Sequence, residues 1–217
     1  MNRAVIFDMD GVIVDSEPIH QECEKKMFDL LGIQVSKEEH NTFMGSTDEN
    51  MWYKLAKTYN LPIRVDEAIQ MKKKLYLEHI MHETTIEPIP GVTELIGCLN
   101  RYGYLLALAS SSPHNQIGYI LSHFKIKHFF HAIVSGEDMK NGKPHPDIFL
   151  KAAEYIEISP AECVVIEDST NGVLAAKNAG MKCIGFLHSN SGSQNLSKAD
   201  YIIHAFDELS PPFINSL

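Results

Sequence analysis

Short apolar runs alternate with longer amphipathic stretches over most of the 217-residue chain. Each apolar run is bounded by turn-forming or polar residues, a pattern typical of strands buried on both faces of a parallel sheet. The predicted strands are AVIFD (4–8), LLALAS (105–110), AIVSG (132–136), CVVIED (163–168), KCIGF (182–186) and DYIIH (200–204). The predicted helices between them are VTELIGCLNRY (92–102), HNQIGYILSHF (114–124), PDIFLKAAEYI (146–156) and NGVLAAKNAG (171–180). This alternation predicts an α/β fold, a doubly wound, mostly parallel sheet with a Rossmann-like core.

The stretch from residue 16 to residue 85 breaks this alternation. Its helix-like segments are IHQECEKKMFDLLG, ENMWYKLAKTYN and VDEAIQMKKKLYLEHIMH, with no convincing strand between them. Because the block separates the first strand from the rest of the sheet, we expect residues 16–85 to form a small α-helical cap domain and residues 1–15 and 86–217 to form the core. The alternative is that these helices simply cover one face of the sheet.

Charge and composition narrow the class of partner. A formal net charge of −9 disfavours nucleic acid, although an acidic protein can still bind a small anion where a cation reverses the local field. No apolar run approaches the roughly 20 residues that a membrane-spanning helix needs. The four cysteines show no CxxC spacing. We therefore expect a cytoplasmic monomer with reduced thiols and with neither a nucleic-acid nor a membrane partner.

Several predicted strands end in polar or charged residues. Asp8 and Asp10 follow the first strand, Ser110 ends the second, and Glu167 and Asp168 follow CVVI. The carboxyl ends of parallel strands meet at one edge of a sheet, where ligands bind at the point at which the strand order reverses. One strand-end aspartate is often only a helix cap or turn former. Together these positions predict a site at that edge.

The acidic residues at this edge predict a magnesium site. Asp8 and Asp10 are two residues apart, a spacing that lets both face the same side where the strand runs into the turn at Gly11. Like charges this close repel unless a cation lies between them. Mg²⁺ suits an oxygen-only site of carboxylates, a carbonyl, waters and a substrate phosphate, which Asp168 would complete.

Four segments resemble, in order and at suitable spacing, the signature motifs of the haloacid dehalogenase-like superfamily: FDMDGVIVDSEP, LALASSS, GKPHPDIF and VVIEDSTNGVLAAKNAG. Within that superfamily the chain is most similar to the helical-cap phosphatases and beta-phosphoglucomutases, whose insert follows the first motif. The resemblance implies magnesium-dependent phosphoryl transfer through an aspartyl-phosphate, with a small phosphorylated metabolite as the substrate.

The resemblance also implies a role for each acidic residue. Asp8 would be the nucleophile, and Asp10 would protonate the leaving oxygen and then activate the incoming water or hydroxyl. The Asp8 side chain, the Asp10 backbone carbonyl and Asp168 would hold Mg²⁺. Glu167 would support that ligand shell.

Two further motif residues would contact the phosphoryl group. The resemblance implies that Ser110 binds it by hydrogen bonds and that Lys143 neutralises charge on it and on the nucleophile. A lysine in NGKPH could on its own be a solvated loop charge. The PHPDIF that follows favours a role for Lys143 in the site, because its prolines restrict the conformation of the loop and a helix starts there.

Cap residues are expected to select the substrate. His20 matches a position that some mutases use near the acid/base, and its alternative is an exposed helix residue. Lys72 is a candidate for binding a second phosphate or a sugar hydroxyl, although a run of three lysines is more often a solvated helix face. FMGSTDENM (43–51) resembles a mutase cap loop, but Asp48 stands where a phosphate-binding arginine is expected.

Three functions follow, in order of preference. The first is a phosphatase acting on small phosphorylated sugars, the second a beta-phosphoglucomutase, and the third a non-catalytic domain that binds Mg²⁺ and phosphate through the same edge. Asp10 favours phosphate-ester chemistry, because true dehalogenases and phosphonate hydrolases usually lack an aspartate there. Asp48 argues against the mutase.

Overall fold

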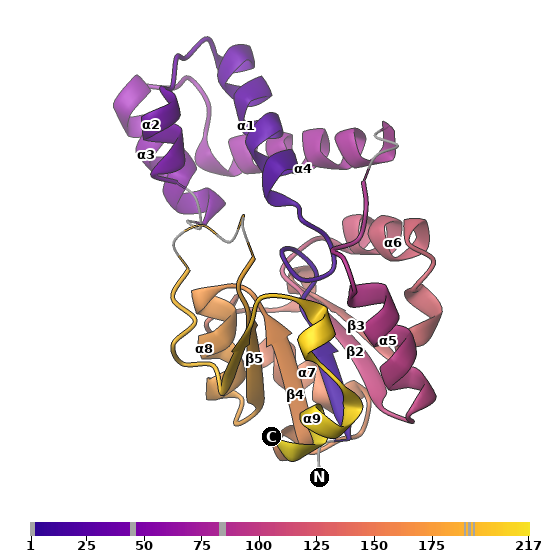
Figure 1. The fold of residues 1–217 in the computed structure, drawn as a ribbon. Helices are drawn as coiled ribbons and strands as arrows, with labels where there is room; N and C mark the ends of the chain where they lie inside the picture. The colour runs from indigo at the N-terminus through magenta and orange to yellow at the C-terminus, as the bar shows by residue number, and fades with distance from the viewer. Residues whose placement is uncertain (1–2, 44–46, 83–85, 189, 191, 193) are drawn as a thin grey trace. The chain divides into compact units, whose positions relative to one another are not determined.

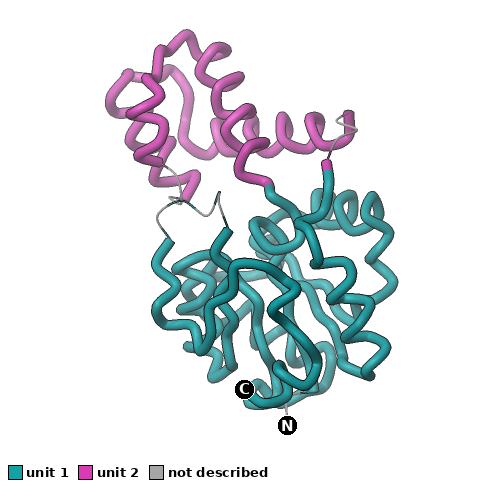
Figure 2. The backbone as a smooth tube through the Cα atoms, in the orientation of Figure 1, with its two compact units in different colours: residues 1–15, 87–217 teal, residues 16–86 magenta. Residues whose placement is uncertain are grey.

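The computed structural model describes residues 3–43, 47–82, 86–188, 190, 192 and 194–217. The chain divides into two compact units, shown in different colours in Figure 2. The first unit comprises residues 1–15 and 87–217, and the second comprises residues 16–86.

The first unit contains a six-stranded, wholly parallel sheet with the strand order β3-β2-β1-β4-β5-β6 (Figure 1). Its strands are β1 (Ala4–Phe7), β2 (Leu105–Ser110), β3 (Ala132–Ser135), β4 (Cys163–Glu167), β5 (Lys182–Phe186) and β6 (Tyr201–Ile203). The predicted α/β fold class is therefore confirmed. In this order the chain switches direction across the sheet next to β1, which places the predicted ligand edge at β1 and β4.

Helices and short 3₁₀ turns connect the strands: α5 (Val92–Arg101), α6 (His114–His123), η1 (Lys127–Phe129), η2 (Gly136–Asp138), α7 (Asp147–Tyr155), η3 (Pro160–Glu162), α8 (Thr170–Asn178), η4 (Phe206–Glu208) and α9 (Pro211–Ser216). One face of the sheet, which includes Ala4 and Ile6, is buried against α7 and α8 in a single hydrophobic cluster. The intervening residues Val5 and Phe7 are also fully buried. Burial of both faces explains why the strands appear in the sequence as continuous apolar runs.

The second unit is helical: α1 (Glu17–Leu31), α2 (Lys37–Asn41), α3 (Asp48–Tyr59) and α4 (Val65–His82). Its core is built around Trp52 and Leu55 of α3, which pack with Met27 and Phe28 of α1. Gly32 ends α1 in the left-handed conformation with φ 67°, and its backbone N–H donates a hydrogen bond to the Asp29 carbonyl in the last turn of the helix. Among the described residues, no helix is both long and apolar enough to cross a membrane.

The segment of the first unit that precedes residue 16 is hydrogen-bonded to the segment that follows residue 86. Val14 forms an isolated antiparallel bridge with Pro88, and the Ile89 N–H donates to the Ile13 carbonyl at 2.9 Å. Backbone hydrogen bonds therefore hold the chain together within the first unit on both sides of the insertion.

Candidate active site

The carboxylates that follow β1 and β4 converge at the carboxyl edge of the sheet. Phe7 pairs with Ile166, and the Asp8 N–H donates to the Ile166 carbonyl at 3.0 Å, so Asp8 continues the line of β1. One carboxylate oxygen from each of Asp8, Glu167 and Asp168 lies within 4.8 Å of the other two. The neighbouring strands therefore assemble an all-oxygen cluster from residues about 160 positions apart in the sequence.

Lys143 is the cation of this cluster. Its Nζ donates to Asp8 Oδ1 at 2.6 Å, to Glu167 Oε1 at 2.7 Å and to the Ala109 carbonyl at 3.3 Å. The lysine side chain is only 8% exposed. Burial lowers the pKa of Lys143, but the carboxylates of Asp8 and Glu167 raise it by more, so the net direction is upward. Lys143 is therefore a fixed ammonium within the site and not a solvated loop charge.

Two glycines allow the carboxylates to approach the backbone. A Cβ on Gly11 would lie 2.0 Å from Asp168 Oδ2, and Gly11 also has a φ of +78°, which side-chain-bearing residues rarely adopt. A Cβ on Gly172, near the start of α8, would lie 1.7 Å from Glu167 Oε1. The compact packing of the acidic cluster therefore depends on the missing side chains at both positions.

Asp10 is held by two serines, one at the end of β2 and one just after it. Ser112 Oγ donates to Asp10 Oδ2 at 2.6 Å, and Ser110 Oγ lies 3.4 Å from the same oxygen. The Ser112 N–H donates to Ser110 Oγ at 3.0 Å. Asp10 Oδ1 is buried and has no hydrogen-bond partner among the described residues. One oxygen of Asp10 is thus fixed, while the other has its hydrogen-bonding capacity unused among the described residues.

The balance of charge at this edge favours a divalent cation. Burial raises the pKa of Asp8 well above its ordinary value, with Lys143 opposing this effect and the neighbouring carboxylates adding to it. Burial likewise raises the pKa of Asp168 to about 6, with the nearby His188 opposing the rise. One ammonium thus faces several buried carboxylates, and all the acidic donors are oxygen, the element that Mg²⁺ prefers. The carboxylate cluster of Asp8, Glu167 and Asp168 therefore fits a divalent cation that prefers oxygen ligands, such as Mg²⁺.

The predicted site residues fall into two sets. The first unit brings six of them to one edge of its sheet: Asp8, Asp10, Ser110, Lys143, Glu167 and Asp168. The other two, His20 and Lys72, belong to the second unit. Residues 44–46 of the stretch compared with a mutase cap loop lie outside the described residues.

The two candidates in the second unit have well-defined surroundings. The His20 ring stacks on Tyr76, with centroids 4.5 Å apart. Lys72 is 5% exposed, and its Nζ donates to Glu24 Oε1 at 2.6 Å and to Asp48 Oδ1. The Glu24 carboxylate also bonds to His40 Nε2 at 2.6 Å. Lys72, the candidate for binding a second phosphate, is therefore already bound by two carboxylates of its own unit.

Sequence reasoning missed Ser112, Gly172 and His188. Ser112 is the third residue of a serine run, and nothing in the run indicates which hydroxyl faces Asp10. Gly172 opens a helix and could equally have been an ordinary helix-start residue. His188 follows β5, and its Nε2 lies 3.9 Å from Asp168 Oδ2, a proximity that only the pairing of β4 with β5 creates.

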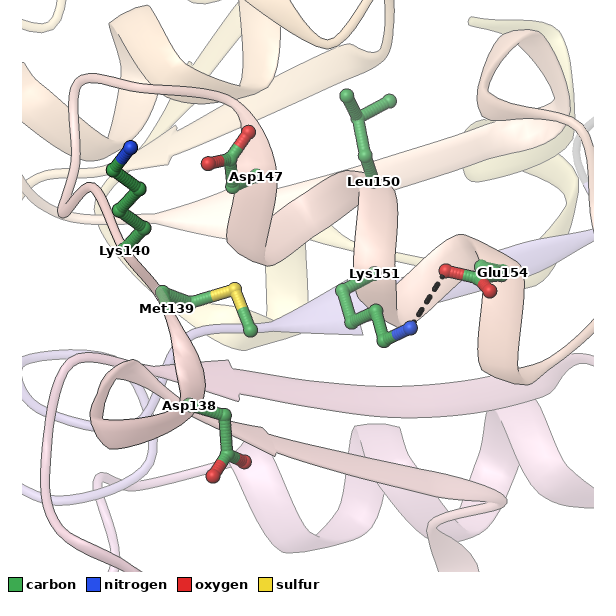
Figure 3. Close-up of a pocket in the computed structure, with 7 residues that line it drawn as sticks. All are labelled: Asp138, Met139, Lys140, Asp147, Leu150, Lys151 and Glu154. Carbon is green, nitrogen blue, oxygen red and sulfur yellow. Dashed lines mark hydrogen bonds and ion pairs between the residues drawn. The ribbon is translucent and has the colours of Figure 1, made fainter.

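A separate hollow of about 310 Å³ lies where the segment after β3 meets α7 (Figure 3). It is lined by Asp138, Met139, Lys140, Asp147, Leu150, Lys151 and Glu154. Lys151 Nζ donates to Glu154 Oε2 at 2.9 Å across one turn of the helix. The lining shares no residue with the acidic cluster, so we do not assign this hollow to the candidate site.

Comparison with known proteins yields consistent matches. A family model described as haloacid dehalogenase-like hydrolase matches residues 5–186. The chain is 33% identical over 206 residues to a phosphorylated carbohydrates phosphatase from Thermotoga maritima, covering 91% of each chain. It is 33% identical over 185 residues to hexitol phosphatase B from Escherichia coli, covering 83% of this chain and 82% of that protein. A crystal structure of beta-phosphoglucomutase from Clostridium difficile matches with a TM-score of 0.82 and 28% identity, covering 100% of this chain and 96% of the other.

Proposed function

Because this chain belongs to the haloacid dehalogenase-like hydrolase family, and is therefore an enzyme rather than a non-catalytic binding domain, we propose that it is a magnesium-dependent phosphatase of small phosphorylated sugars. The observation that carries this proposal is the buried cluster in which Lys143 bridges Asp8 and Glu167 beside Asp168. The substrate class is supported by the similarity to two sugar-phosphate phosphatases.

Asp8 is the nucleophile in this mechanism. One of its carboxylate oxygens attacks phosphorus, the bond from phosphorus to the sugar oxygen breaks, and an aspartyl-phosphate forms. The Lys143 ammonium, 2.6 Å from Asp8 Oδ1, opposes the effect of burial on the pKa of this carboxyl and stabilises charge on the phosphoryl oxygens. When bound by Asp8, Asp168 and the Asp10 carbonyl, Mg²⁺ supplies further positive charge for those oxygens.

Asp10 is the general acid of the first half-reaction and the general base of the second. In the first half-reaction its carboxyl gives a proton to the departing sugar oxygen, and in the second it takes a proton from the water that attacks the aspartyl-phosphate, releasing inorganic phosphate. The hydrogen bond from Ser112 Oγ to Asp10 Oδ2 fixes the side chain while Oδ1 is left for the proton. Ser110, at the end of β2, donates to a phosphoryl oxygen.

The nucleophile is tested by Asp8→Asn, which exchanges one carboxylate oxygen for an amide and removes the covalent route. We expect phosphatase activity to fall by at least about 1,000-fold, or roughly 4 kcal/mol in transition-state free energy. Asp207→Asn changes an exposed carboxyl of η4 and serves as the matched control with parental activity. Activity of Asp8→Asn within about tenfold of the parent would refute the assignment. Beryllium fluoride, which mimics the aspartyl-phosphate, is expected to inhibit the parent.

A second candidate function is that of a beta-phosphoglucomutase, which is favoured by the 28% identity to that enzyme from C. difficile. A mutase must hold a bisphosphate by its second phosphate and exclude water while a sugar hydroxyl attacks the aspartyl-phosphate. Here Lys72 is neutralised by Glu24 and Asp48, which leaves the second unit without this lysine as a free phosphate anchor. We therefore rank the phosphatase first.

A coupled assay separates the two functions. Beta-glucose 1-phosphate is supplied with a trace of glucose 1,6-bisphosphate, and both inorganic phosphate and glucose 6-phosphate are measured over time. We expect phosphate release from hexose phosphates or smaller sugar phosphates to exceed isomerisation. Isomerisation much faster than phosphate release would replace the phosphatase by the mutase.

A further inference from the structure

His188 lies at the same edge of the sheet as the proposed magnesium ligands. It follows β5, whose residue Gly185 pairs with Glu167 of β4. His188 Nε2 is 3.9 Å from Asp168 Oδ2, and the two side chains are 12% and 16% exposed. The imidazole and the carboxylate therefore interact in a largely dehydrated space, where electrostatic interactions are strengthened.

The neighbours of His188 fix the orientation of its ring. The ring stacks on Phe186, with centroids 5.3 Å apart and planes inclined by 20°. The Asn190 backbone N–H donates to His188 Nδ1 at 3.3 Å, and the Asn190 side chain donates to Asp15 Oδ2 at 2.6 Å. Because Nδ1 accepts a hydrogen bond, the hydrogen-bond network assigns the proton of the neutral ring to Nε2. The nitrogen that carries this proton is the one 3.9 Å from Asp168 Oδ2, so its interaction with the carboxylate is electrostatic and longer than a hydrogen bond.

From this arrangement we infer that His188 is a positioning residue, which holds the Asp168 carboxylate in the orientation that binds Mg²⁺. The inference rests on the proposed function, because Asp168 is a ligand only in that mechanism. Carboxylates that bind metals are commonly oriented by such outer partners, and removing a partner typically costs about 10-fold to 100-fold in metal affinity. The Gly11 backbone packs against Asp168 Oδ2, so contacts from two loops define the position of this carboxylate.

Three substitutions of His188 distinguish the effect of the Nε2 hydrogen-bond donor from the effect of the aromatic ring that packs on Phe186. His188→Phe keeps an aromatic ring on Phe186 but removes the N–H. His188→Gln can place an amide donor near the position of Nε2, whereas His188→Asn places its amide near the position of Nδ1. If Mg²⁺ binding depends on the donor at the position of Nε2, glutamine preserves that binding and asparagine does not.

The measurement is Mg²⁺ binding to the whole protein by isothermal titration calorimetry, with Mn²⁺ binding by electron paramagnetic resonance as an independent readout. We expect His188→Phe and His188→Asn to weaken binding by about 10-fold to 100-fold and His188→Gln by less than about threefold. Melting temperatures in EDTA should match the parent. In turnover assays the Mg²⁺ concentration for half-maximal activity should rise in the first two variants, while kcat at saturating Mg²⁺ stays near the parental value.

Asp168→Ala distinguishes failure of this inference from failure of the proposed function. If Asp168→Ala loses Mg²⁺ binding while His188→Phe binds as the parent does, the role of His188 is overturned and the metal site stands. Equal losses in the Phe, Gln and Asn variants would overturn it as well, because packing and not the donor would then matter. Parental Mg²⁺ binding by Asp168→Ala would instead overturn the metal site itself.

Discussion

The packing of Gly172 against Glu167 leads to a quantitative prediction for Gly172→Ala. The added methyl group would lie 1.7 Å from Glu167 Oε1 and 1.8 Å from its Cδ, so the carboxylate must move. That carboxylate accepts hydrogen bonds from Lys143 Nζ at 2.7 Å, from the Ser169 N–H at 2.8 Å and from Ser169 Oγ at 3.0 Å. Hydrogen bonds to charged groups contribute about 1.5–3 kcal/mol each, and alanine gains at most about 1 kcal/mol in helix propensity. We expect a net loss of about 2–4 kcal/mol in the free energy of unfolding.

For a chain of this length, such a loss lowers the melting temperature by roughly 5 to 15 °C. Phosphatase activity should fall with it, because Glu167 can no longer orient Lys143. Gly118→Ala is the matched control: Gly118 lies within α6, and a Cβ there would meet nothing within 4 Å. That control should gain about 0.5–1 kcal/mol. Thermal unfolding followed by circular dichroism measures both variants. A Gly172→Ala protein that melts at or above the parental temperature contradicts the close approach described here.

Further predictions concern the second unit and the metal. Lys72→Met leaves the Glu24 carboxylate buried beside the substituted side chain and should cost about 3–5 kcal/mol, whereas Lys74→Met, at a lysine side chain that is 78% exposed, should cost almost nothing; urea unfolding compares them. EDTA should abolish activity and Mg²⁺ restore it, while Ca²⁺ should support little turnover because its coordination is looser; full activity after exhaustive chelation would contradict the site. Burial raises the pKa of Asp168 from the ordinary 3.8 to about 6. Without Mg²⁺, the folded state therefore binds more protons than the unfolded state between these two pH values. The contribution of this carboxyl to the free energy of unfolding accordingly falls as the pH rises through that range. Protons and Mg²⁺ compete for Asp168, so the rise in melting temperature produced by Mg²⁺ should grow as pH increases through about 6, and calorimetry at several pH values should detect it.

The fold could be predicted almost completely because its strands are buried on both faces. LLALAS and KCIGF are strands over the predicted residues, and each of the other four strands ends one residue before the predicted end, with DYIIH also starting one residue late. The short helices α2 and α9 were not predicted, because five or six residues are too few to display a helical period. Their positions depend on packing against the rest of their units.

The composition of the site was easier to predict than its internal contacts. Asp8 and Asp168 could be located because each follows a strand that the apolar pattern reveals. The hydrogen bond from Ser112 to Asp10, and the position of His188 beside Asp168, depend on loop conformations that no periodicity encodes. The burial of Lys72 between Glu24 and Asp48 was also hidden, because three consecutive lysines give no indication of which one faces inward.

The position of β1 between β2 and β4 has a consequence for the order of folding. β1 spans Ala4–Phe7, but its two neighbours in the sheet begin only at Leu105 and Cys163. Closing such long loops costs conformational entropy and slows the formation of the central strand pairs. The second unit packs residues that are close in sequence, so it can fold earlier and shorten the loop that β1 has to close. On a ribosome Asp8 would therefore be synthesised long before Glu167 and Asp168, and it could meet these carboxylates only after the strands that carry them have been made.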